Sequence, residues 1–319
     1  LNLDLKPGSR RILELRQETG KTSVKKYEAF ERSICSDGRI HGAFQFYGAG
    51  RTGRWAGRLI QPQNFPRNAF EDIALARQLV KSEQWDEIEM LYGSMNDVFS
   101  TLIRTLIVPP EGMTFAIADY SAIEARVVAW MADEKWRQDV FANGGDIYCM
   151  SATQMFGVPV EKHGQNSHLR KKGKVAELAC GYGGGVGALR KMGGEQMGLT
   201  EKEMDNIVKK WRRSSPHVVR LWRELGDAAI EAIDTRLRVK CRHGVSFKYA
   251  KGILFMQLPS GRSLAYVQPR FDGRELTYMG MNQTTRKWER TKTWGGKLTE
   301  NLIQAIARDC LAVSMSKIQ

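Results

Sequence analysis

One short segment constrains the fold more than any other: an apolar run ends in a carboxylate and passes directly into a helix. Residues 114–118 are mostly apolar and predict a strand, Asp119 follows, and a helix is expected from Ser121 to about Ala132. Strand ends beside helix starts are where α/β folds commonly place ligand chemistry. A single carboxylate there suits a hard cation such as Mg²⁺, which takes few protein oxygens and several from phosphate.

The same segment also has a purely structural interpretation. Asp119 could end the strand and lead into the helix without holding a ligand. Ser121 and Glu124 have the spacing of a capping box, in which two side chains accept hydrogen bonds from free backbone N–H groups at a helix start. Both interpretations stay open from this segment alone.

A basic stretch at residues 168–183 predicts a second functional element. Arg170, Lys174, Leu178 and Tyr182 recur at every fourth residue. Because each step of four drifts only ~40° around a helix, the four side chains share one face over ~18 Å. Two cations followed by an apolar and an aromatic residue match a nucleoside triphosphate, with phosphates at one end and the base at the other. The alternative is a solvated charged face.

Composition favours a polyanionic partner. Lys and Arg total 49 against 35 Asp and Glu in 319 residues, a formal net charge of +14. A pI near 9.6 is typical of nucleic-acid binding. No apolar stretch approaches the ~18 residues of a membrane helix, and no signal peptide opens the chain, so no membrane partner is expected. The five scattered cysteines argue against a zinc site and favour a reducing cytosol.

Periodicity predicts a mixed α/β chain in which a helical block interrupts a strand-bearing platform. Residues 38–47 are expected to form a strand, and residues 69–104 are expected to form helices. The region 133–235 is predicted to be mostly helical, and 236–297 to hold short strands and turns. A final helix is expected over 298–319. Since the first residue is Leu and not Met, we expect a piece of a longer protein.

Together these segments resemble family A DNA polymerases, the DNA polymerase I group, and bacteriophage members in particular. Residues 119–126 resemble the family's motif A, normally D-Y-S-x-I-E-L-R, and only Ala125 departs. Residues 170–183 resemble motif B on the O helix of the fingers. Residues 300–309 resemble the helix that returns to the palm. Residues 52–66 resemble the primer–template loop T-G-R-L…P-N-L-Q-N-I-P, with departures at Trp55, Ile60, Gln61 and Pro62.

The resemblance implies a right-hand polymerase fold of the α/β (α+β) class. The palm would hold an antiparallel sheet, the fingers would be mostly helical, and the thumb would be only partly present. The implied division is the end of the thumb at 1–36, the palm at 37–128, the fingers at 129–297 and the returning palm helix at 298–319.

The resemblance also implies roles in the reaction. Asp119, helped by the Tyr120 carbonyl, would bind two catalytic Mg²⁺ ions: one activates the primer 3′-hydroxyl and the other neutralises the triphosphate and leaving pyrophosphate. Arg170 and Lys174, the other two catalytic residues, would hold the incoming phosphates. Glu124 would be a steric gate against a ribose 2′-hydroxyl and so favour dNTPs.

Further contacts are implied for the nucleotide and the DNA. Tyr148 stands where many relatives have a phosphate-contacting His, and Tyr182 would stack near the templating position. Leu178 replaces the usual Phe or Tyr, so we expect slower incorporation than in a Phe variant. Minor-groove contacts check pair geometry almost independently of sequence. Four side chains would contact the primer–template duplex, largely in that groove: Arg54, Gln61, Asn64 and Gln304.

The implied activity is template-directed DNA synthesis in DNA replication, with dNTPs added to a primer 3′-hydroxyl and pyrophosphate released, in the cytoplasm (of the host, if the protein is viral). The family's motif C, a His-Asp-Glu sequence with the second catalytic carboxylate, is missing. None of the five histidines is followed by Asp, and the motif should lie past Gln319. We therefore expect this chain alone to be nearly inactive and its parent protein to polymerise DNA. Most of the thumb and any proofreading exonuclease would also lie elsewhere.

The sequence leaves two alternatives open. A single-subunit RNA polymerase has a related plan, but Glu124 argues against it, because a ribonucleotide enzyme should leave room for the 2′-hydroxyl. A domain that binds primer–template without extending it is compatible with the missing motif C, and the reading frame beyond Gln319 would decide that question. Replication accessory proteins would be further partners, but no residue identifies them.

Overall fold

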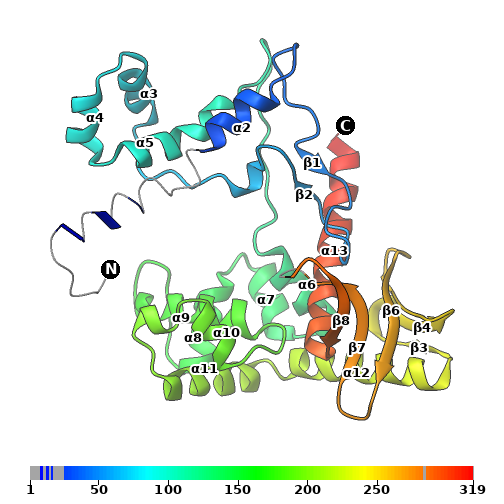
Figure 1. Ribbon diagram of the computed structural model, residues 1–319. Coiled ribbons are helices and arrows are strands. Elements are labelled where there is room, and N and C mark those ends of the chain that lie inside the picture. Colours follow the sequence, from blue (N-terminus) through cyan, green and yellow to red (C-terminus); the bar gives the residue numbers. More distant parts are fainter. Residues whose placement is uncertain (1–7, 10–11, 14–15, 17–24, 283–284, 319) are drawn as a thin grey trace. The chain divides into compact units, whose positions relative to one another are not determined.

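The computed structural model describes residues 8–9, 12–13, 16, 25–282 and 285–318 (Figure 1). The chain divides into two compact units, one with residues 1–49 and 55–118 and the other with residues 50–54 and 119–319. Helices and antiparallel sheet make up the regular structure, so the predicted α+β class is confirmed. The segment predicted as the end of a thumb lies in part outside the described residues. The division into thumb, palm and fingers stays a prediction.

The first unit is built from short helices. They are α2 (Lys25–Ser33), α3 (Ile73–Lys81), α4 (Trp85–Tyr92) and α5 (Met95–Leu102), with 3₁₀ turns η1 (Pro62–Asn64) and η2 (Ile103–Leu106). One apolar cluster, which includes Leu79, Ile88 and Val98, joins α3, α4 and α5. In another, Phe30 of α2 packs against Phe65. The helices predicted over 69–104 are therefore confirmed.

Only two residues of the strand predicted over 38–47 form one. Strand β1 (Phe44–Gln45) pairs antiparallel with β2 (Ala56–Gly57). Gly42 and Tyr47 have positive φ angles of 73° and 54°, so the chain turns on either side of β1 and the extended backbone ends there.

The second unit combines a helical block with a six-stranded meander. Its helices are α6 (Ile123–Ala132), α7 (Lys135–Ala142), α8 (Ile147–Phe156), α9 (Ser167–Cys180), α10 (Val186–Lys191), α11 (Glu201–Ser214), α12 (Pro216–Thr235) and α13 (Gly295–Ile318), with 3₁₀ turns η3 (Glu195–Met197) and η4 (Arg242–Gly244). Its strands are β3 (Arg238–Lys240), β4 (Ser246–Ala250), β5 (Ile253–Gln257), β6 (Ser263–Phe271), β7 (Leu276–Met281) and β8 (Trp288–Thr293), paired antiparallel in chain order. The helical middle, the short strands and the final helix are thus confirmed.

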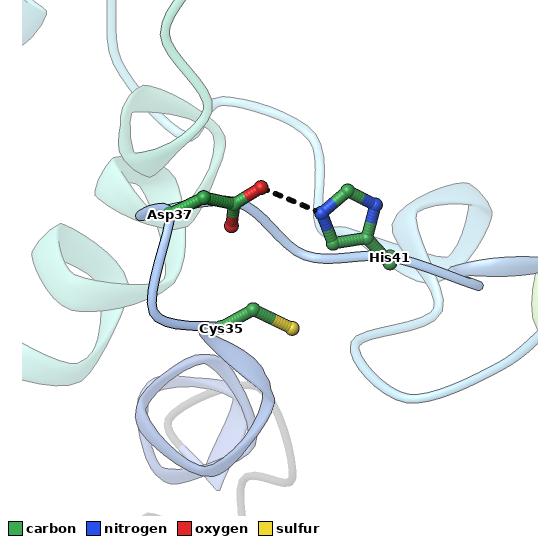
Figure 2. A group of neighbouring side chains, drawn as sticks. All are labelled: Cys35, Asp37 and His41. Carbon is green, nitrogen blue, oxygen red and sulfur yellow. Dashed lines mark hydrogen bonds and ion pairs between the residues drawn. The ribbon is translucent and has the colours of Figure 1, made fainter.

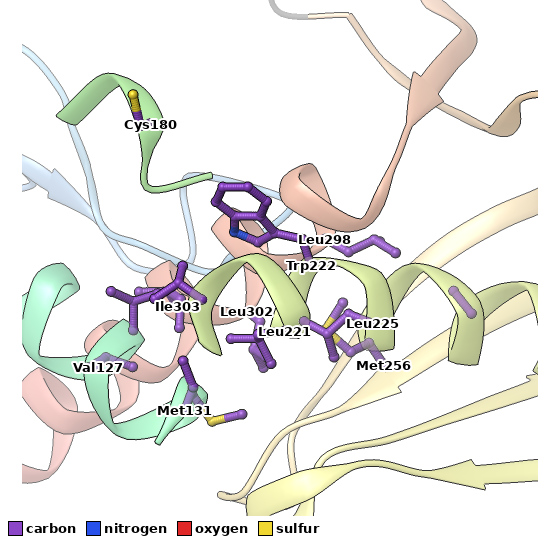
Figure 3. Packing of buried hydrophobic residues seen from close by; sticks show 14 of the residues in the cluster. Val127, Met131, Cys180, Leu221, Trp222, Leu225, Met256, Leu298, Leu302 and Ile303 are labelled. Carbon is purple, nitrogen blue, oxygen red and sulfur yellow. The ribbon is translucent and has the colours of Figure 1, made fainter. Parts of the chain in front are cut away.

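The main core lies where α12 meets one face of this sheet and α13. Leu221 and Leu225 of α12 lie close to Met256 of β5 and to Leu298 of α13 (Figure 3). α12 and α13 approach so closely that a Cβ on Gly295 would lie 1.7 Å from the Trp222 carbonyl oxygen. This contact needs glycine, and it fixes the start of α13 against the helical block.

The strand predicted over 114–118 is not formed. Residues 113–120 have no regular structure, and the side chain of Ile117 is 91% exposed. A strand is stable only where the N–H and C=O groups of a neighbour pair with it. Among the described residues, no strand pairs with this segment, so its apolar sequence has no partner to order it.

The capping box predicted at Ser121 and Glu124 is also wrong. Helix α6 begins at Ile123, and Ala122 precedes it with a left-handed φ of 53° and no side-chain cap. The Glu124 carboxylate accepts instead a hydrogen bond from Tyr182, 58 residues later in the chain. Glu124 therefore does not cap the start of α6, as the purely structural interpretation of this segment required.

Candidate nucleotide-binding site

Helix α9 places the predicted cationic face next to α8. Arg170, Lys174 and Leu178 lie on the helix, and Tyr182 follows its end by two residues. The Tyr148 ring of α8 lies beside both cations, with its centre 5.4 Å from the Arg170 guanidinium carbon and 5.9 Å from the Lys174 Nζ. The structure therefore brings together Tyr148, Arg170 and Lys174, which the sequence separates.

Gly173 allows this close packing of α8 and α9. A Cβ on Gly173 would lie 2.2 Å from the Tyr148 carbonyl oxygen and 3.0 Å from the Ala152 Cβ. Any larger residue would push the two helices apart, so Gly173 sets how near Tyr148 lies to the cations. The sequence pattern alone did not single out this glycine.

Asp146 holds Arg170 in place. The guanidinium donates to Asp146 Oδ2 from Nε at 2.9 Å and from Nη2 at 2.7 Å. The other oxygen, Oδ1, accepts from the backbone N–H groups of Tyr148 and Cys149 and so caps α8. Burial alone would raise the pKa of Asp146, but the bonds from Arg170 and the two N–H groups outweigh it and leave that pKa below its usual value. One carboxylate thus fixes both the helix start and the cation.

Tyr182 connects this face to α6. Its hydroxyl donates to Glu124 Oε2 at 3.0 Å. Burial, the Glu124 charge and this hydrogen bond together raise the pKa of the Tyr182 hydroxyl well above its usual value. The proton therefore stays on Tyr182, and Glu124 is held as an acceptor. Leu178 is 49% exposed on the same side of α9 and is free to contact a ligand.

A buried ion pair supports α9 from behind. The Glu177 carboxylate accepts two bonds from Arg137, at 2.6 and 2.8 Å, and one from the Trp211 indole at 2.8 Å. Arg137 is fully buried and also donates to Ser215. This network was not predicted from the sequence, although a Glu between the apolar positions of a predicted helix was a usable signal.

Asp119 is exposed in the irregular segment before α6. Its neighbour Tyr120 bonds through its hydroxyl to Ser314 of α13. Within the described part of the chain, Asp119 belongs to no group of three metal-ligating side chains. Carboxylate and carbonyl oxygens are the donor types that Mg²⁺ prefers, and Mg²⁺ commonly takes only one or two carboxylates together with substrate phosphates. The Asp119 carboxylate and the Tyr120 carbonyl therefore offer the types of oxygen that Mg²⁺ binds.

The predicted DNA contacts fall in both units. Gln61 and Asn64 lie in the first unit and bond to each other, Asn64 Nδ2 donating to Gln61 Oε1 at 3.0 Å. Arg54 and Gln304 lie in the second unit, Arg54 exposed and Gln304 bonded to Glu300 on α13.

A contact missed from the sequence secures the Arg54 loop. Arg308 of α13 donates to the Gly53 carbonyl oxygen at 3.0 Å. This bond holds residues 50–54 to the last helix of the second unit.

Cys35, Asp37 and His41 gather on one turn of the first unit (Figure 2). Their ligand atoms lie within 4.8 Å of one another, an arrangement that the scattered cysteines did not predict. All three are exposed, and His41 Nε2 lies 2.8 Å from Asp37 Oδ2. This hydrogen bond lowers the pKa of Asp37 and accounts for the pair without an ion.

Comparisons with known proteins place these features in a family. The profile of DNA polymerase family A matches residues 2–239. The chain is 53% identical to the DNA polymerase of Bacillus phage SP02 over 314 residues, which are 97% of this chain and 48% of the phage protein. It is also 33% identical, over 116 residues, to DNA polymerase I of Rhizobium leguminosarum, covering 36% of this chain and 11% of that protein. The matched part of the chain thus spans about half the length of the phage relative and a smaller share of the Rhizobium protein.

A solved structure supports the fold. The POL domain of Pol1 from M. smegmatis, in complex with a DNA primer-template and dNTP, matches with a TM-score of 0.56 over 92% of this chain and 40% of that chain, at 20% identity. The chain belongs to DNA polymerase family A. The predicted resemblance is therefore confirmed. Across the described residues, no helix has the length and hydropathy that crossing a membrane requires.

Proposed function

We propose that the protein containing this chain catalyses template-directed DNA synthesis in DNA replication, adding dNTPs to a primer 3′-hydroxyl with release of pyrophosphate. The observation that carries the proposal is the face of α9, where Arg170 and Lys174 lie beside Tyr148 in a chain of this family. The M. smegmatis relative was solved with a primer-template and a dNTP, which supports the same ligands for this chain.

The side chains on and next to α9 have different roles. Arg170 and Lys174 hold the triphosphate, and Arg170 exchanges its bond to Asp146 for a phosphate oxygen when the nucleotide arrives. Leu178 offers apolar surface to the sugar. Glu124, held by Tyr182, occupies the space that a ribose 2′-hydroxyl needs, so deoxynucleotides are favoured.

Asp119 and the Tyr120 carbonyl would hold the catalytic Mg²⁺ ions. When bound, Mg²⁺ neutralises charge on the triphosphate and favours loss of the primer hydroxyl proton. We infer that a second carboxylate completes this site, because the His-Asp-Glu motif that supplies it in the family does not occur in this sequence. The chain alone is accordingly expected to bind primer–template but to extend it poorly.

Tyr182 and the DNA-contacting side chains complete the proposal. Tyr182 stacks near the templating position. Arg54, Gln61, Asn64 and Gln304 contact the duplex. We place this activity in the cytoplasm, that of the host if the protein is viral.

Primer extension by the complete protein tests the function. We expect extension with dNTPs and Mg²⁺, weak extension with rNTPs, and loss of extension in Asp119→Asn and Lys174→Ala. Lys202→Ala, on an exposed face of α11, is the matched control and should extend normally. Preference for rNTPs would indicate an RNA polymerase. Tight primer–template binding by a complete protein that never extends would indicate a binding domain.

A further inference from the structure

The six-stranded sheet has one face outside the core. Its other face carries Phe247, Leu254, Tyr266 and Tyr278, which are buried in the main core together with α12. The register places the alternate residues of all six strands on the opposite, outer face. Figure 1 shows α12 running along one side of the sheet only.

This outer face is cationic. Within the six strands, its positions include six Lys or Arg side chains and no Asp or Glu: Arg238, Lys240, Lys248, Arg270, Arg290 and Lys292. One carboxylate, Glu275 just before β7, reaches it and bonds to Lys292. Among the described residues, Arg290 donates to two neutral oxygens, those of Gln268 and Thr277, and these contacts do not compensate its charge. The face therefore attracts a polyanion.

Exposed indole rings stand at both ends of the edge strand β8. Trp288 is 56% exposed at the start of the strand, and Trp294, immediately after it, is 55% exposed. Because side chains alternate along a strand, Trp288, Arg290, Lys292 and Trp294 follow one side of the edge over ~20 Å, at ~3.3 Å per residue. Aromatic rings interleaved with cations are typical of surfaces that bind single-stranded nucleic acid.

The far end of this row reaches the nucleotide site. A Cβ built on Gly183, the residue after Tyr182, would lie 3.7 Å from the Trp294 indole nitrogen. A cavity of about 650 Å³ lies there, between α12 and the core-facing side of the β7–β8 edge, and Lys292, Trp294 and Gly183 are among the residues that line it. Its lining adds three more guanidinium groups, those of Arg212, Arg223 and Arg274, against the carboxylates of Asp227 and Glu275.

We propose that the β8 row, defined as Trp288, Arg290, Lys292 and Trp294, binds the unpaired template strand ahead of the templating position. This inference rests on the proposed function, which places the templating base near Tyr182. Unpaired bases have free faces for the indole rings, whereas the bases of a duplex are already stacked on one another. The cations bind the phosphates of the same strand, and the cavity lets it pass from β8 to Gly183.

Fluorescence anisotropy with primer–templates of different 5′ overhang tests the inference. The 319-residue chain is titrated onto one hairpin primer–template that carries a template overhang of 2 or 12 nucleotides. We expect the longer overhang to bind about tenfold more tightly, as expected for stacking of one or more bases. In Trp288→Ala and in the double variant Arg290→Gln/Lys292→Gln this gain should largely vanish, while binding to the short overhang stays unchanged.

Salt dependence and a matched control sharpen the test. Loss of two phosphate contacts to a single strand should lower the slope of log affinity against log salt by about 1.4 for the long overhang. The control Lys202→Gln/Lys209→Gln removes two exposed lysines from α11 and should keep the full gain. Melting curves for each variant verify that it folds.

The outcomes separate the two proposals. If the short overhang binds but the longer one adds nothing, the role of the β8 row is wrong and the proposed function stands. The role of the β8 row is equally wrong if the α11 control loses as much of the gain. If the chain binds neither primer–template, both proposals fail for it. Cross-linking of an iodouracil placed in the overhang provides a second readout: transfer to Trp288 or Trp294 supports the inference, and transfer only to other regions contradicts it.

Discussion

Replacing Gly173 by alanine tests the most demanding contact of the candidate site. In an ordinary helix this change stabilises by about 1 kcal/mol, because alanine has the higher helix propensity. Here the new Cβ would lie 2.2 Å from the Tyr148 carbonyl oxygen, while ordinary contacts begin near 3.4 Å. The two helices must therefore separate by about 1 Å.

The expected magnitude follows from these opposing effects. Overpacking against a well-packed neighbour costs about 1–3 kcal/mol, and the upper end applies because the neighbour is backbone and not a flexible side chain. The net result for Gly173→Ala is a loss of about 2 kcal/mol. For a unit of roughly 200 residues this lowers the Tm by about 4–8 °C.

Thermal and denaturant unfolding measure the effect, with Gly187→Ala as the matched control. Gly187 lies exposed in α10, and a Cβ there would meet no atom within 4 Å. That variant should melt at or slightly above the wild-type temperature. If Gly173→Ala also melts at or above wild type, the close packing of α8 on α9 is refuted, and with it the position of Tyr148 beside the cations.

Three further variants test neighbouring features. Glu177→Ala leaves the buried Arg137 charge without its carboxylate, with only Ser215, among the described residues, still accepting from it, and should lower the free energy of unfolding by about 3–5 kcal/mol in urea titration. A loss below about 1 kcal/mol would contradict burial of the pair. The pKa of Asp146 is lower in the folded state than in the unfolded chain, where it is near ~4. The bond from Arg170 to the Asp146 carboxylate therefore stabilises the fold fully above pH ~4, and this stabilisation is lost as the pH falls through the folded-state pKa. The Tm difference between wild type and Asp146→Asn should shrink in acid, and a constant difference would refute this. In the complete protein, Leu178→Phe should incorporate dNTPs faster in single-turnover kinetics, and an unchanged rate would sink that expectation.

Local periodicity accounts for the parts of the site that were predictable. The α9 face could be predicted because residues four apart in a helix share a face wherever the helix lies. The strand over 114–118 failed for the opposite reason: its apolar residues favour an extended backbone, but a strand also needs a neighbour to pair with. The capping box failed because Glu124 bonds to Tyr182, which no local pattern connects to it.

The sequence by itself determined the family, the alternation of helices and short strands, and the residue types of the candidate nucleotide site. These depend on motifs and on spacing along one element. Only the tertiary structure decided that Asp146 holds Arg170, that Gly173 lets Tyr148 approach the cations, and that six cations share one face of the sheet. Each of these depends on the docking of one element against another or on strand register, because distances between elements are set by packing and not by their separation in the sequence.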